Sequence, residues 1–162
     1  MILQVAGLDP SFRNWGVAEA SLDLDTGVLS NPHLSVIKTG DEPKGKQVRQ
    51  NSHDLIAASE LAGAMSLLIP SVKIFFVEVP HGSQSASSMK GYGVCIGILG
   101  YMRATGATII EVSESESKKV FVGKRTATKE EMINKAVGYY PDANWPRRGG
   151  KIVAGTAEHM AD

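Results

Sequence analysis

Two apolar segments of this chain each end in a carboxylate with a proline close behind it. Residues 1–8 run into Asp9-Pro10, and residues 74–77 run into Glu78, with Pro80 two positions later. Short apolar runs stopped by proline are typical of strands buried in a sheet. A charge at the end of such a strand costs free energy unless a cation or hydrogen bonds compensate it. Either carboxylate alone would be explained as a cap of its strand, but together Asp9 and Glu78 indicate two core strands whose ends could share one divalent ion.

The remaining apolar patterns predict an α/β fold with a mixed sheet and helices packed on it. Strands are expected at 1–8, 15–24, 34–39, 73–79 and 107–112. Helices are expected at 48–69, 89–105, 115–122 and 129–139, and from about 156 onward. Residues 40–45 and 141–150 are expected to form loops. Three consecutive strands followed by strands that alternate with helices are typical of a mixed five-stranded sheet.

The composition favours one globular domain over residues 1–162. Apolar residues make up 43% of the chain, and Cys95 is the only cysteine, so no internal disulfide forms and a reducing, cytoplasmic compartment is expected. No secretory signal is visible at the start. The longest uncharged apolar run lies between Lys90 and Arg103 and is too short to cross a bilayer, so no membrane partner is expected.

The charges are unevenly distributed, although the chain has 17 basic and 17 acidic residues. Nine Lys and Arg residues lie between Ser117 and Lys151, against three acidic residues in the same segment. Such a segment is often no more than a solvated helix face. Beside an acidic body, it also suits an enzyme that binds a polyanion at a carboxylate-rich site.

The last five residues are a third candidate for metal binding. On a helix, Glu158, His159 and Asp162 share one face because they are three and four positions apart. Carboxylate oxygens favour Mg²⁺ or Mn²⁺, and Mn²⁺ also accepts imidazole. A frayed, solvated terminus would explain the same residues without any metal.

Several motifs, in this order along the chain, are similar to those of one nuclease family. They are residues 7–11 (GLDPS) with 16–18 (GVA), 77–78 (VE), 117–124 (SKKVFVGK) with 127–130 (ATKE), and 159–162 (HMAD). In these motifs the chain resembles the RuvC-type Holliday junction resolvases of the ribonuclease H-like superfamily. The resemblance covers essentially the whole chain. It implies a ribonuclease H-like α/β fold, with a mixed five-stranded sheet and helices on both faces.

The resemblance also implies a catalytic centre with two metal ions. Asp9, Glu78, His159 and Asp162 would bind two Mg²⁺ ions, for which Mn²⁺ can substitute, and these would orient water and stabilise the leaving oxygen of a phosphodiester. Spacing alone does not choose between Glu158 and His159 as the ligand. In the family the last helix continues beyond its final Asp, so we expect the sequence to end inside that helix.

The basic segment and the loop after Glu78 would contact DNA in the same resemblance. Lys118 and Lys129, five residues before and six after Gly123, match lysines that neutralise phosphates near the scissile bond. His81 stands where the family usually has an aromatic that stacks on bases. Further DNA contacts are expected from Lys119, Lys124 and Arg125.

The implied activity is the resolution of four-way DNA junctions in recombination and repair, by paired symmetric nicks. A homodimer suits a two-fold junction, and the helix with Gly91, Gly93, Gly97 and Gly100 would form its interface. Tight packing of these glycines on the sheet would explain them equally well.

Two alternatives stay open: a nuclease for a wider range of branched DNA, and a junction-binding relative without catalysis. A dinucleotide-binding site is excluded, because the glycines around residue 91 lack the required spacing and lie too far from their strand.

Overall fold

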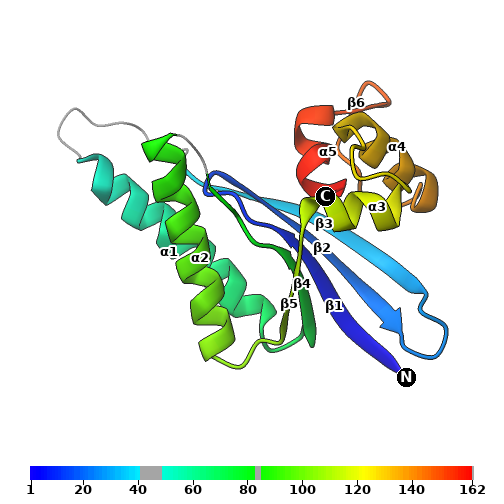
Figure 1. The fold of residues 1–162 in the computed structure, drawn as a ribbon, viewed down its shortest axis with the longest axis horizontal. Coiled ribbons are helices and arrows are strands. Elements are labelled where there is room, and N and C mark those ends of the chain that lie inside the picture. Colours follow the sequence, from blue (N-terminus) through cyan, green and yellow to red (C-terminus); the bar gives the residue numbers. More distant parts are fainter. Residues whose placement is uncertain (41–48, 83–84, 162) are drawn as a thin grey trace.

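A computed structural model describes residues 1–40, 49–82 and 85–161 of the protein. Its main sheet has five strands in the order β3-β2-β1-β4-β5 (Figure 1). They are β1 (Ile2–Asp9), β2 (Asn14–Asp23), β3 (Leu29–Lys38), β4 (Ile74–Glu78) and β5 (Ile109–Val112). Strands β1, β2 and β3 are antiparallel neighbours, whereas β4 is parallel to β1 and β5 is parallel to β4. The predicted mixed five-stranded sheet is confirmed.

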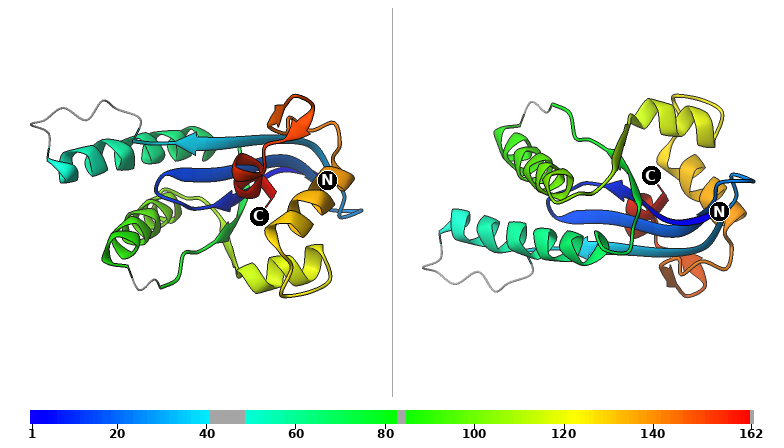
Figure 2. Two further views of the ribbon diagram at one scale, coloured as in Figure 1. Left: turned by 90° about the horizontal axis from the view of Figure 1, so that it is seen from above. Right: turned by 90° about the horizontal axis from the view of Figure 1, so that it is seen from below.

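Helices lie on both sides of this sheet, as predicted. They are α1 (Gln50–Leu68), α2 (Ala86–Ala104), α3 (Glu114–Phe121), α4 (Lys129–Tyr139) and α5 (Ala154–Ala161). Helices α1 and α2 cover one face, and α3, α4 and α5 gather on the opposite side (Figures 1 and 2). None of the helices in the described ranges combines the length and apolar character needed to cross a membrane.

Successive side chains of each strand point to opposite faces of the sheet, so each face has a core of its own. Alternate residues of β1, β2 and β4 point toward α1 and α2 and form the larger core, which includes Leu8, Val17 and Val77. A smaller cluster around Leu34 and Trp145 joins β3 to α4 and α5. A strand residue that directly follows a residue of the larger core, as Asp9 follows Leu8, therefore points to the opposite face, where α3, α4 and α5 lie.

The predicted bounds of five segments need correction. Strand β3 begins at Leu29 rather than at residue 34, because Pro32 is tolerated in a strand at the sheet edge. The expected loop 141–150 contains β6 (Arg147–Arg148), which pairs with β7 (Lys151–Ile152). Helices α2 and α5 begin three and two residues earlier than expected, at Ala86 and Ala154. Strand β5 begins at Ile109 rather than at residue 107. Most of the expected loop 40–45 and the expected helix start at 48 lie outside the described residues.

A buried carboxylate ties α1 to α2 and to the turn after β1. Asp54 accepts hydrogen bonds from Arg13 Nη2 at 3.0 Å, from Gln50 Nε2 at 3.1 Å and from Lys90 Nζ. The Lys90 hydrogen bond, more than any other contact, holds the pKa of Asp54 below its ordinary value. The charged form of Asp54 therefore stabilises the fold, and it also orders the turn that follows Asp9.

Replacing Asp54 by Asn is expected to lower the free energy of unfolding at pH 7 by about 1–3 kcal/mol, because three donors lose a charged acceptor. Since the pKa of Asp54 is depressed on folding, its contribution is complete above the unfolded pKa and disappears as pH falls through the folded one. The difference between wild type and variant should thus shrink below about pH 4. Urea unfolding of both proteins at pH 7 and pH 3 measures it. An equal difference at both pH values would contradict this role.

Candidate functional site

The ends of two neighbouring strands place Asp9 beside Glu78. Strands β1 and β4 are parallel, and their register pairs Leu8 with Val77. Both paired residues belong to the core under α1 and α2, so the next residue of each strand points to the other face. The predicted neighbourhood of Asp9 and Glu78 at one edge of the sheet is confirmed.

Helix α5 brings His159 against Asp9 because β2 has a glycine at the contact. His159 Nδ1 lies 3.1 Å from Asp9 Oδ2, and the two side chains are 20% and 24% exposed. Gly16, the cross-strand partner of Asp9, lies directly under the backbone of His159. A Cβ on Gly16 would stand 1.6 Å from the carbonyl oxygen of His159, so no other residue fits there without moving α5.

A polar cavity of about 370 Å³ opens at this edge of the sheet. The acidic, basic and imidazole side chains that line it are Asp9, Glu78, His81, Glu114, Lys129, Glu158 and His159. They come from β1, β4, α3, α4 and α5 and from the loop after β4. Residues that are far apart in the sequence thus meet as four carboxylates, two imidazoles and one ammonium group.

Two lysines of the basic segment are held by carboxylates of this cavity. Lys129 Nζ lies 2.8 Å from Glu158 Oε2, and Lys118 Nζ contacts Glu114 Oε1 one helical turn away. Each hydrogen bond is the largest cause that keeps the pKa of its glutamate below the ordinary value. Lys118 is only 15% exposed, whereas Lys129 is 66% exposed and itself lines the cavity.

Asp9 is in a different electrostatic position from these glutamates. Burial raises its pKa, and the hydrogen bond and charge of His159 oppose this effect. Glu158 adds a further negative charge nearby, which also raises the pKa of Asp9. A desolvated carboxylate among other carboxylates is the environment that a bound cation would relieve, and oxygen donors are those that Mg²⁺ and Mn²⁺ prefer.

The donor atoms are therefore of the kind that binds a divalent ion, but the described residues do not form a complete set of metal ligands. Among residues 1–40, 49–82 and 85–161, no three His, Cys, Asp or Glu side chains are grouped closely enough to hold one ion. Asp162, the fourth predicted ligand, lies outside the described residues. Of the two alternatives at the end of the chain, His159 contacts Asp9, whereas Glu158 Oε1 lies 3.7 Å from His159 Nε2 and its other oxygen binds Lys129.

Of the other residues predicted to contact DNA, one lies in the cavity and three lie outside it. His81 lines the cavity. Lys119, Lys124 and Arg125 are exposed on α3 and on the turn after it, and they do not line the cavity. Lys124 is paired with Glu131 at 2.5 Å.

Glu114 is a cavity residue that the sequence analysis missed. It is the first residue of α3, directly after the N-cap Ser113. Ser113 and Glu116 form a capping box, as Thr128 and Glu131 do at the start of α4. A Ser or Thr followed three residues later by Glu is a visible signal for a helix start. It would have placed Glu114 in the first turn, one helical turn before Lys118.

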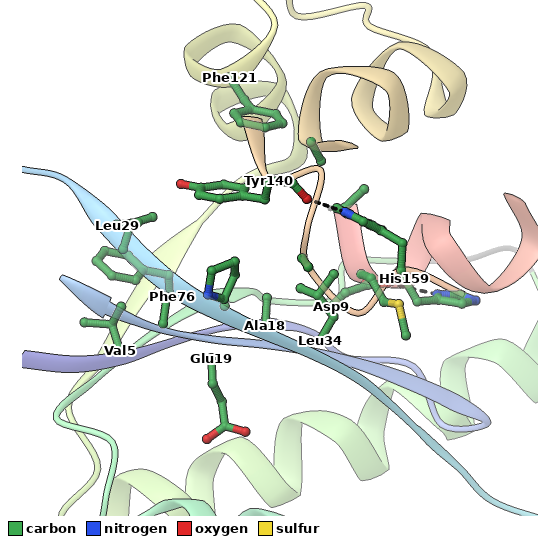
Figure 3. Close-up of a pocket in the computed structure, with 18 residues that line it drawn as sticks. Val5, Asp9, Ala18, Glu19, Leu29, Leu34, Phe76, Phe121, Tyr140 and His159 are labelled. Atoms are coloured by element: carbon green, nitrogen blue, oxygen red, sulfur yellow. Dashed lines mark hydrogen bonds and ion pairs between the residues drawn. The ribbon is translucent and has the colours of Figure 1, made fainter. Parts of the chain in front are cut away.

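An apolar cavity of about 230 Å³ lies on the other side of Asp9 and His159. Figure 3 shows Phe121 and Tyr140 above the sheet residues Val5 and Phe76, with Asp9 and His159 at the far end. This cavity lies between part of the sheet and residues of α3 and α4. Its apolar lining suits packing rather than the binding of a charged substrate.

No known protein family and no curated protein matches this sequence. Among solved structures, the chain is similar to Thermus thermophilus RuvC, with a TM-score of 0.65 and 18% sequence identity over 99% of this chain and 92% of the other. It is also similar to T. thermophilus RuvC in complex with Holliday junction substrate, with a TM-score of 0.66 and 17% identity over 98% and 91% of the two chains. The protein thus has the RuvC-like, ribonuclease H-like α/β fold.

Proposed function

We propose that this protein is a divalent-metal-dependent endonuclease that resolves four-way DNA junctions. The observation that supports it most is the meeting of Asp9, Glu78 and His159 with Lys129 in one polar cavity, at the strand ends of a RuvC-like fold. One of the similar structures holds a Holliday junction substrate. The basic segment supplies positive charge beside the carboxylates, as a phosphodiester substrate requires.

The proposed reaction is hydrolysis of one phosphodiester bond in each of two opposed strands. A water oxygen attacks phosphorus, the bond to the 3′ oxygen breaks, and a proton passes to that leaving oxygen. Asp9, Glu78, His159 and Asp162 would hold the metal ions, which supply Lewis-acid activation and charge neutralisation when bound. His159 keeps the Asp9 carboxylate oriented, and Glu158 directs the Lys129 ammonium toward the cavity, where it would meet a phosphate.

Replacing Lys118 or Lys129 by Ala is expected to slow cleavage about 10²-fold, because each lysine stabilises charge on the phosphate. The slope of log affinity for DNA against log salt should become less steep by about one unit in each variant. Nicking rates and salt titrations of junction binding measure these effects. Lys73→Ala is the matched control, since Lys73 lies before β4, at the opposite end of that strand from Glu78. Wild-type rates and salt slopes in both variants would show that the segment is only a solvated face.

A homodimer through α2 is also proposed. Along this helix, Gly93, Gly97 and Gly100 are exposed, and a Cβ built on any of them meets no atom within 4 Å. Met89 and Ile96 are exposed apolar side chains of the same helix, 46% and 47% accessible. The alternative explanation, tight packing, holds for Gly91, which is buried and where a Cβ would lie 3.2 Å from the Cβ of Phe12. It does not hold for the other three glycines, which are exposed and have open space around them. Small residues beside exposed apolar ones leave room for a partner backbone.

Gly97→Leu is expected to convert the dimer to a monomer and to abolish paired nicking. The monomer itself should remain folded, because Leu raises helix propensity by about 0.8 kcal/mol over Gly and open space surrounds the site. Gly138→Leu on α4, also exposed and without close neighbours, is the matched control. Light scattering gives the oligomeric state. A wild-type protein that is monomeric at micromolar concentration would contradict the dimer.

A second candidate function is junction binding without cleavage. The observation that favours it is that the described residues alone do not group three metal donors. The two functions separate when binding of a four-way junction is measured in chelator and nicking is measured in Mg²⁺ and in Mn²⁺. Binding with no nicking in either metal would favour the binding protein, and metal-dependent nicks at the junction would exclude it.

A further inference from the structure

The hairpin formed by β6 and β7 has an unusual concentration of positive charge. Its two residue pairs are Arg147 with Ile152 and Arg148 with Lys151. Gly149 and Gly150 form the turn with φ angles of 56° and 79°, a left-handed conformation at both positions that favours glycine. Three of the four strand residues are therefore cations. The two glycines of the turn have no side chains that could shield them.

The hairpin is fixed at its base to β3, the edge strand of the main sheet. Asn144 donates a hydrogen bond from Nδ2 to the carbonyl oxygen of Leu34 at 2.7 Å and accepts one from the Leu34 amide at 2.8 Å, as a neighbouring strand would. The Trp145 side chain is buried, and its Nε1 donates to the carbonyl oxygen of Tyr140. The amide of Val153 donates to the carbonyl oxygen of Pro146 at 2.8 Å and closes the base. The backbone that carries the three cations is thus anchored to the rest of the fold at its base.

The hairpin cations have no acidic partner within the described part of the chain, although Arg147 donates a hydrogen bond from Nη1 to the carbonyl oxygen of Gly150 at 3.3 Å. Arg148 and Lys151 stand directly opposite each other, an arrangement of like charges that destabilises a pair of strands. No carboxylate of the described residues forms an ion pair with either of them. In contrast, Lys118, Lys124 and Lys129 are all paired with glutamates. The hairpin cations are therefore available to an anion from outside the molecule.

The hairpin also has a defined place relative to the candidate site. It leads directly into α5, which carries Glu158 and His159. Figure 2 shows the hairpin and α3 on opposite sides of α5 in the views from above and from below. A polyanion that lies across the site can thus be held on one side by α3 and on the other by the hairpin.

We propose that the β6–β7 hairpin is a second DNA-binding element, which binds the sugar–phosphate backbone of a DNA arm on the β3 side of the candidate site. This rests on the proposed function and adds Arg147, Arg148 and Lys151 to its DNA contacts. The guanidinium group of arginine matches the geometry of phosphate oxygens, and contacts of this kind are independent of base sequence. The hairpin positions an arm of the junction; it takes no part in bond cleavage.

The test compares wild type with the double variant Arg148→Ala/Lys151→Ala. Binding of a fluorescent four-way junction is measured in chelator over a series of salt concentrations, so that cleavage plays no part. The double variant is expected to bind at least about tenfold more weakly at low salt, with a slope of log affinity against log salt that is less steep by about 1–2 units. Arg148→Lys keeps the charge and should retain most of the affinity.

Two further proteins separate a loss of charge from other effects. Lys73→Ala removes one positive charge before β4 and should leave the salt slope unchanged. Arg148→Gln/Lys151→Gln keeps long polar side chains and should show the same loss as the alanine variant, with the melting temperature of wild type.

The outcomes distinguish this proposal from the function on which it rests. Wild-type protein that binds the junction, together with a glutamine double variant that keeps its affinity and salt slope, overturns the hairpin proposal and leaves the proposed function intact. Wild-type protein that binds no DNA at any salt concentration overturns both. A less steep slope in both double variants, with unchanged binding by Lys73→Ala, supports the hairpin proposal.

Discussion

Replacing Asp9 by Asn is expected to slow junction cleavage at least about a thousandfold, because a displaced metal ion loses several kcal/mol of transition-state stabilisation. The fold should survive, since Asn keeps the shape of Asp and its side-chain oxygen can still accept a hydrogen bond from His159. Burial already raises the pKa of Asp9, so removal of its charge relieves a desolvated carboxylate. The melting temperature should therefore stay equal or rise.

The Asp9→Asn experiment has a matched control in Asp142→Asn. Asp142 is exposed on the loop after α4 and does not line the polar cavity. Both variants lose one negative charge, and only the first should lose cleavage. Junction binding in chelator should persist or tighten in Asp9→Asn, because less negative charge faces the phosphates. Nicking by Asp9→Asn at the wild-type rate would remove the metal-dependent mechanism.

Gly16→Ala is expected to reduce both stability and cleavage, through the position of α5. The added Cβ would lie 1.6 Å from the backbone oxygen of His159, so the helix must move away from β2. We expect a loss of about 1–3 kcal/mol in the free energy of unfolding and at least about a 10²-fold loss of cleavage, because His159 and Glu158 leave the cavity. Hydrogen exchange of the α5 amides should become faster.

Gly7→Ala is the control for this substitution. Gly7 lies in β1, two residues before Asp9, and a Cβ there would meet its nearest atom at 4.0 Å, an ordinary contact. It should therefore keep the stability, the α5 protection and the cleavage of wild type. Equal behaviour of the two variants would show that the close approach of α5 to Gly16 does not matter for the site.

The order of the main strands and helices could be predicted because the sequence marks their ends. Pro10 and Pro80 follow the two core strands closely, and the structure confirms that Asp9 and Glu78 are adjacent. The start of β3 could not be found in this way, because Asn31-Pro32 is typical of a turn. In the structure both residues lie inside the edge strand β3. Asn31 has a φ of 52°, and the missing amide donor of Pro32 is tolerated at a sheet edge.

Two contacts between distant residues have no signal in the sequence. The pairing of Glu158 with Lys129 joins two helices, and no spacing along the chain indicates it. The close approach of Gly16 to His159 depends in the same way on where α5 docks. By contrast, the β6–β7 hairpin had a local signal: two glycines between short segments predict a tight turn. That signal was missed because each strand has only two residues.

The measurement that tests the central claim most directly is strand cleavage of a labelled four-way junction beside a matched duplex. Wild-type protein and Asp9→Asn are each incubated with both DNAs in Mg²⁺, in Mn²⁺ and in chelator. The account predicts symmetric nicks in two opposed strands of the junction, by wild type only and with metal only, and an intact duplex. An intact junction in both metals, under conditions in which wild-type protein is folded and binds it, would contradict the account.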